Sequence, residues 1–198
     1  MRIIFFLSFF LTPFFFQAQE KFEVKEVGFS MNVPFEWIEV KNNEVLNNLD
    51  NFDFTKEQKS KLLTSSNSAN ELVTYYKYHP SKFNGIIPTV KVRTRSVNSK
   101  SIDEFLKVIE LSNNEASKTL KNFKYQKEPE LITVSGKQVV SFSVKFELSH
   151  NGKESNVVSS SYYVLKNGYF ISINFIEELN KENNEIFFKE LLSSIELK

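Results

Sequence analysis

The chain has 198 residues, enough for one domain with its own hydrophobic core. Its 25 basic and 24 acidic side chains leave a net charge of +1, so it has no bulk electrostatic attraction to nucleic acid or anionic lipid. Cysteine is absent, which excludes disulfides, thiol nucleophiles, zinc–thiolate sites and a lipidated cysteine.

The N-terminus predicts export. Met1-Arg2 precedes an apolar run from Ile3 to Phe16, and the small residue Ala18 follows. This pattern is typical of a signal peptide, here residues 1–18, which would leave residues 20–198 as a single secreted or periplasmic domain without a stable membrane anchor. The alternative is an uncleaved anchor, but the apolar run as a helix would span only about 21 Å of a hydrocarbon core of about 30 Å.

The first half of the mature chain mixes strands and helices. Alternation predicts strands over Phe22–Val27 and Phe29–Val33, with Gly28 as a bend between them, and a short strand over Trp37–Val40. Residues 42–63 have a polar helical pattern. Within it, Thr55 and Gln58 have the spacing of a capping box, which predicts a helix start.

The middle of the chain contains two strands and the best-defined helix. We expect strands over Leu72–Tyr78 and Thr89–Val97 because both segments are rich in β-branched or aromatic residues. The helix should run from Ile102 to about Leu120, with Ser101 and Glu104 as a capping box.

The last third predicts an antiparallel meander. Its strands are expected over the following ranges: Leu131–Val134, Gln138–Leu148, Ser155–Leu165 and Tyr169–Phe175. Asn151-Gly152 and Asn167-Gly168 are strong hairpin signals between them. A final helix over Lys181–Leu192 should pack four apolar residues on the sheet: Ile186, Phe187, Leu191 and Ile195. The fold class is therefore α+β, a central antiparallel sheet with helices packed on it.

The order of these elements resembles the PsbP/DcrB-like families. The segment from Phe29 to Trp37 is similar to their opening, an apolar strand that runs into Pro, two residues and Trp. Many such openings carry Gly just before the Trp, where this chain has Glu36. The resemblance implies an α/β/α sandwich and a function by binding. It brings no catalytic residue with it, and fold-level analogy assigns no partner.

Two groups of residues could carry metal or acid–base chemistry. His79 and His150 are the only histidines, and both lie beside turn signals, where an exposed polar residue needs no special reason. The carboxylates Asp50, Asp53 and Glu57 lack the spacing and the glycine of a calcium loop. The sequence thus predicts no catalytic residue, no metal site and no cofactor.

One surface feature suggests a partner. Lys91, Arg93 and Arg95 alternate along one strand and place three like charges on one face, which requires either solvent or an acidic partner. We expect a non-enzymatic envelope protein that binds a protein or envelope component, with this stripe as a possible contact for an anionic partner and with no nucleic-acid partner. The alternatives are a secreted or periplasmic hydrolase with a carboxylate or histidine site, and a carrier of a small apolar ligand.

Overall fold

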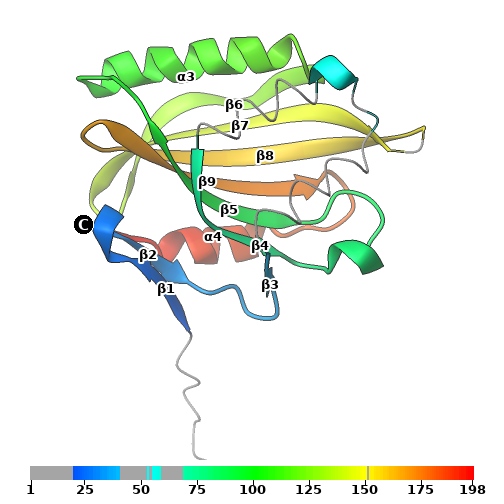
Figure 1. The fold of residues 1–198 in the computed structure, drawn as a ribbon, viewed down its shortest axis with the longest axis horizontal. Coiled ribbons are helices and arrows are strands. Elements are labelled where there is room, and N and C mark those ends of the chain that lie inside the picture. The colour runs from blue at the N-terminus through cyan, green and yellow to red at the C-terminus, as the bar shows by residue number, and fades with distance from the viewer. Residues whose placement is uncertain (1–19, 41–52, 54, 59–68, 151) are drawn as a thin grey trace, which may run out of the picture.

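The computed structural model describes residues 20–40, 53, 55–58, 69–150 and 152–198. A seven-stranded antiparallel sheet runs through them, in the order β3-β4-β5-β9-β8-β7-β6 (Figure 1). The strands are β3 (Ile38–Glu39), β4 (Ala69–Tyr76), β5 (Thr89–Ser96), β6 (Lys121–Val134), β7 (Lys137–His150), β8 (Lys153–Leu165) and β9 (Tyr169–Glu178). The expected central antiparallel sheet is therefore confirmed, and strand dominates the described chain.

A second, small sheet joins the two ends of the domain. Its order is β1-β2-β10, with β1 (Lys21–Val24) and β10 (Glu196–Leu197) on either side of β2 (Phe29–Asn32). A 3₁₀ turn, η1 (Lys25–Val27), precedes Gly28, whose φ of 63° confirms the expected bend. A Cβ on Gly28 would lie 3.1 Å from Lys198, so the close approach of the C-terminal residue also requires glycine here.

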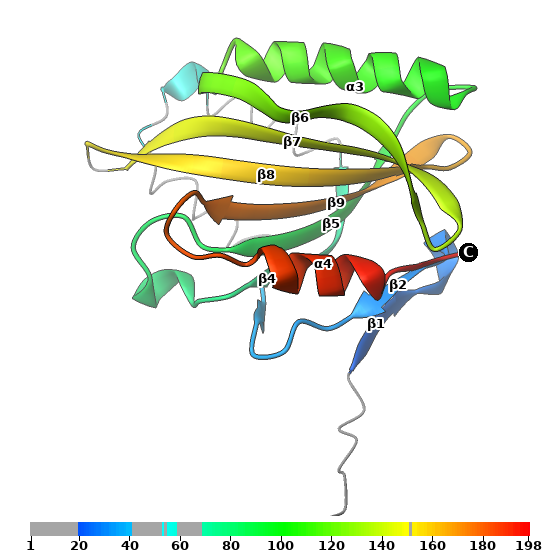
Figure 2. The same ribbon diagram turned by 180° about the vertical axis from the view of Figure 1, so that it is seen from behind.

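Two helices cover opposite faces of the large sheet. Helix α3 (Ile102–Ser117) lies along β6 and β7, and α4 (Glu185–Ser193) lies on the other face beside the small sheet (Figure 2). On the α3 face, Phe105 and Ile109 pack against apolar residues of β7, namely Val140, Phe142 and Val144. On the α4 face, Phe188 stacks on Phe175 of β9 at 4.8 Å. The expected sandwich is therefore matched in part: helices lie on both faces of the sheet, but they are short and strand makes up most of the described chain.

The expected cap at Thr55 is confirmed, the cap at Ser101 forms in part, and the hairpin expected at Asn167-Gly168 joins β8 to β9. Thr55 and Gln58 form reciprocal side chain-to-backbone hydrogen bonds of 2.9 and 3.1 Å, although the rest of the helix expected over 42–63 lies outside the described residues. At α3, the Ser101 hydroxyl accepts from the Glu104 N–H at 3.2 Å. The Glu104 carboxylate accepts from the N–H of Lys100 instead of completing the box at Ser101.

Strand β6 is longer than the sequence pattern predicts. The expected strand began at Leu131, but β6 begins at Lys121. Three register shifts interrupt its pairing with β7, so its polar residues do not alternate as in a regular strand. β6 is also the edge of the sheet, and charged residues and proline are typical of edges because they oppose further strand pairing.

The final helix is shorter than expected and has a different buried face. It begins at Glu185 instead of Lys181. The expectation that Ile186 packs on the sheet is wrong, because its side chain is 73% exposed, whereas Phe188 is buried. Phe187 turns toward Trp37 and stacks on its ring at 4.9 Å, so Trp37 lies half-buried against the core. Within the described ranges, no helix is long and apolar enough to cross a bilayer.

Candidate functional site

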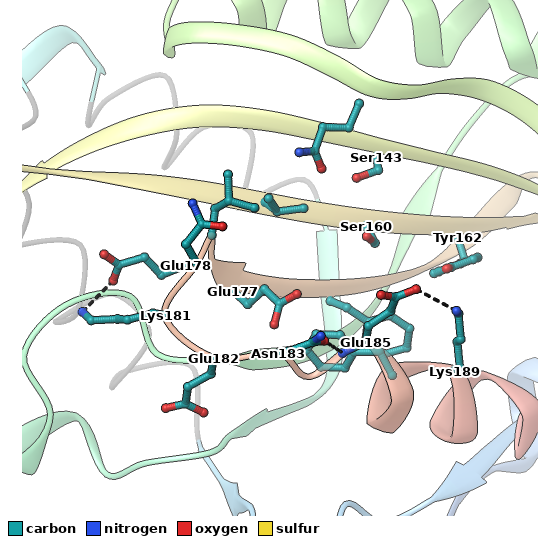
Figure 3. A pocket seen from close by; sticks show the side chains of 16 residues that line it. Ser143, Ser160, Tyr162, Glu177, Glu178, Lys181, Glu182, Asn183, Glu185 and Lys189 are labelled. Atoms are coloured by element: carbon teal, nitrogen blue, oxygen red, sulfur yellow. Dashed lines mark hydrogen bonds and ion pairs between the residues drawn. The ribbon is translucent and has the colours of Figure 1, made fainter.

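A cavity of about 650 Å³ opens on the α4 face of the sheet, and we call it the α4 groove (Figure 3). Its floor comes from β6 to β9, and its wall comes from residues 179–183 and the first turns of α4. The nine residues of α4 span about 13 Å, whereas the 14 residues of β7 span about 46 Å. One end of this sheet face therefore lies beyond the reach of the helix.

Small polar side chains form the floor of the α4 groove. Ser143 of β7 pairs directly with Ser160 of β8, so both hydroxyls lie on the same face. Tyr162 lies two residues further along β8 and shares that face, and its ring packs against Phe175 at 5.6 Å. Burial raises the pKa of Tyr162, and the nearby Lys127 and Lys189 only partly oppose this shift.

A carboxylate of β9, Glu177, joins the sheet to the start of α4 in the wall of the groove. Glu177 of β9 accepts hydrogen bonds through Oε2 from the backbone N–H of Asn184 at 3.3 Å and from its amide Nδ2 at 3.0 Å. Asn184 is buried, and its Oδ1 accepts in turn from Lys77 at 2.9 Å. Because a helix N-terminus has unsatisfied N–H groups and a partial positive charge, Glu177 is well placed to stabilise α4.

The other charged residues of the lining form ion pairs. Lys181 lies 2.8 Å from Glu178, and Lys189 lies 2.7 Å from Glu185 (Figure 3). Glu182 accepts from Lys77 at 2.6 Å and from the Tyr78 hydroxyl at 2.8 Å. The two contacts of Glu182 join the end of β4 to the connection between β9 and α4 and so hold this part of the groove wall.

The ion pairs also set the direction of two carboxylate pKa values. Burial opposes ionisation of Glu182, but the hydrogen bonds from Lys77 and Tyr78 outweigh it and hold the pKa of Glu182 below its ordinary value. The hydrogen bond from Lys189 lowers the pKa of Glu185. A general acid needs the opposite shift, a raised pKa.

The basic stripe lies on the other face of the sheet, the α3 face. Lys91 of β5 lies 2.6 Å from Glu71 of β4, and only 12% and 9% of the two side chains are exposed. Burial lowers the pKa of Lys91, and the neighbouring charge of Arg93 lowers it further. The three basic residues alternate along β5 as expected. The acidic partner of Lys91 is Glu71 of the same chain. Arg93 and Arg95 are partly exposed on the same face.

Polar side chains continue this face across three strands. Thr74, Lys91 and Asn174 are neighbours in register on β4, β5 and β9. Asn174 donates to the Ser161 hydroxyl at 2.7 Å. Among the described residues, three buried atoms here make no hydrogen bond: Thr74 Oγ1, Arg93 Nε and Asn174 Oδ1.

The other candidate residues of the described chain lie at turns and strand ends. His79 caps the 3₁₀ turn η2 (Pro80–Lys82), where its Nδ1 accepts from the Ser81 N–H at 3.2 Å, and His150 ends β7. Asp53 accepts from the N–H of Gly152 at 3.1 Å and so supports the β7–β8 hairpin, while Asp50 lies outside the described residues. Within the described part of the chain, no group of three His, Asp or Glu side chains could hold a metal ion.

The α4 groove was missed at the sequence level. Its lining comes from positions between 126 and 189 that only the sheet and the β9–α4 connection bring together. The one available signal was the alternation of Ser with large apolar residues in β7 and β8. Serines on one face of a sheet indicate that no apolar helix surface packs on that part of the face.

Comparison with known proteins shows the fold. No protein-family model matches the chain, and no curated protein matches it. Among solved structures, cyanobacterial PsbP from Synechocystis sp. PCC 6803 is similar with a TM-score of 0.52 and 12% identity, over 90% of this chain and 92% of that one. LpqN of Mycobacterium tuberculosis, a protein involved in cell envelope biogenesis, has a TM-score of 0.51 and 11% identity, over 93% and 87%.

A structure from Bacteroides thetaiotaomicron is also similar, with a TM-score of 0.48 and 13% identity. The match covers 91% of this chain, which spans about half (48%) of that longer protein. At these identities the similarities concern the fold alone. The expected resemblance is confirmed at that level, because this chain has a PsbP-like fold.

Proposed function

We propose that this chain is an exported accessory protein of the bacterial cell envelope that binds a protein or envelope component in the α4 groove. The observation that carries the proposal is the groove itself, about 650 Å³ in volume, with a wall that Glu182 joins to the end of β4 by accepting hydrogen bonds from Lys77 and Tyr78. Cavities of this size are typical of binding sites, and a fixed lining lowers the cost of binding. The similarity in fold to LpqN, which is involved in cell envelope biogenesis, supports the location.

The character of the lining favours binding over the alternative, a hydrolase. Glu182 and Glu185 are stabilised as anions, whereas a glycosidase-type acid must hold its proton at neutral pH. Ser143 and Ser160 face the groove, but a serine nucleophile needs an adjacent base, and neither histidine lines the cavity.

Photocrosslinking in the host tests the proposal. A benzophenone amino acid would replace Ser143 in the groove, Asn183 on its wall, or Leu111 of α3, which is 65% exposed and lies on the other side of the sheet. We expect Ser143 and Asn183 to capture the same extracytoplasmic partner, as identified by mass spectrometry, and Leu111 not to capture it. The same products from all three positions would contradict a role for the groove.

The stripe of Lys91, Arg93 and Arg95 supports a second contact, with an anionic partner. Because Lys91 is already paired with Glu71, this contact would depend on Arg93 and Arg95. Charge reversal of both arginines should remove a partner captured from the α3 face while leaving the groove products unchanged. An unchanged set of α3-face partners would contradict it.

A further inference from the structure

We infer that the α4 groove accepts a lysine or arginine side chain from an extended segment of the protein partner, with Glu177 as the residue that recognises the positive charge. This inference rests on the proposed function and specifies what the groove selects. Three features carry it: the charge balance of the lining, the fixed orientation of the Glu177 carboxylate, and the uncharged floor of the groove.

The first feature is a glutamate of the lining that forms no ion pair with a described residue. Four glutamates and two lysines line the groove. Each lysine is paired with its own glutamate, and Lys77 neutralises Glu182 from the adjacent strand end. Among the described residues, no cationic side chain forms an ion pair with Glu177, the fourth glutamate. A cation of the partner would therefore meet one carboxylate that forms no ion pair within the described part of the chain.

The second feature is the fixed orientation of this carboxylate. Glu177 lies between β9 and the Asn183–Glu185 turn, as Figure 3 shows. Its Oε2 accepts both hydrogen bonds from Asn184, and no described residue donates to Oε1, so this oxygen can accept from a ligand. A carboxylate that is already oriented loses little conformational entropy when a ligand binds, and hydrogen bonds between charged groups are the strong ones.

The third feature is the neutral floor beneath it. The hydroxyls of Ser143 and Ser160 can accept further hydrogen bonds from an ammonium or guanidinium group. The aromatic ring of Tyr162 offers a surface on which a cationic side chain can pack. The two lysines of the wall are held by glutamates, so their repulsion of an incoming cation is reduced.

The decisive variant is Glu177→Gln, which removes the charge and keeps an oxygen that can accept from Asn184. Glu190→Gln is the matched control, because Glu190 is exposed on α4 and does not line the groove. Ser160→Ile is a second variant that fills the groove floor with a strand-compatible side chain and leaves every charge in place. Thermal unfolding would be measured for each protein.

The probes are three fluorescent decapeptides of alternating Ser with Lys, Gln or Glu, and binding is measured by fluorescence anisotropy at low salt. We expect the lysine peptide alone to bind the unsubstituted protein. Binding should weaken about tenfold in Glu177→Gln, as for the loss of one charged hydrogen bond, disappear in Ser160→Ile and stay unchanged in Glu190→Gln.

Three results would overturn the inference: no binding of the lysine peptide, equal binding of the glutamine peptide, or equal weakening in Glu177→Gln and Glu190→Gln. If Glu177→Gln fails to fold, persistent lysine-peptide binding in Ser160→Ile overturns it as well. None of these results affects the photocrosslinks at Ser143 and Asn183, so failure of this inference can be distinguished from failure of the proposed function.

Discussion

Replacing Glu36 by glycine should stabilise the protein. Glu36 is the third residue of a turn that the Trp37 N–H closes onto the Pro34 carbonyl at 3.2 Å, and its φ is 61°. A left-handed conformation costs a residue with a Cβ about 1–2 kcal/mol. Glycine avoids this cost but loses about 0.5–1 kcal/mol more conformational entropy on folding. The expected net gain in the free energy of unfolding is about 1 kcal/mol, or about 2–4 °C in Tm for a chain of this size.

The control is Glu39→Gly. Glu39 is exposed and belongs to the two-residue strand β3. Its backbone is extended, so glycine there should destabilise the protein by about 0.5–1 kcal/mol. Both variants would be measured by urea unfolding and by thermal melts followed by circular dichroism. Similar destabilisation in the two variants would refute the idea that the Glu36 backbone is strained. A gain in the free energy of unfolding of Glu36→Gly would give a physical reason for the glycine that many PsbP/DcrB-like sequences carry just before the Trp.

Three further predictions concern the core, the helix cap and pH. Phe188→Ala should lower the free energy of unfolding by about 3–5 kcal/mol because it removes a buried ring that stacks on the core, whereas Ile186→Ala on the exposed side of α4 should change it by less than about 1 kcal/mol; urea unfolding that ranks them the other way would contradict the assigned face. Ser101→Ala should cost about 1 kcal/mol through loss of its hydrogen bond to Glu104, and an unchanged urea midpoint would argue against a working cap. Burial raises the pKa of Tyr75 to about 12, so stability present below pH 10 should be lost as the pH rises toward 12, by up to about 2–3 kcal/mol; Tyr75→Phe should remove most of this loss, and equal alkaline destabilisation with and without the tyrosine would contradict it.

The meander could be predicted from sequence because local signals agree with the final sheet. From Val140 to Leu148, β7 alternates between apolar and small or polar side chains. β7 and β8 pair in a register that sets His150 opposite Lys153, on either side of the Asn-Gly signal in the sequence. A hairpin turn and the period of two fix the same pairing, so no long-range information is needed.

Elements that depend on tertiary packing could not be predicted in the same way. Ile186, Phe187 and Phe188 are consecutive apolar residues, so helical periodicity alone does not say which of them is buried. Contacts with Phe175 and Trp37, distant in sequence, decide the orientation of α4. The α4 groove also depends on tertiary packing. Glu177 is positioned by the hydrogen bond that it accepts from Asn184, and no spacing in the sequence indicates this contact.

An extracytoplasmic location is the first requirement of the proposed envelope function. Whole cells of the host would be fractionated, and the N-terminus of the protein would be determined by mass spectrometry. We expect a chain that begins after Ala18 and is recovered from the periplasmic or secreted fraction. A chain that retains Met1 and remains in the cytoplasmic fraction would contradict an envelope function.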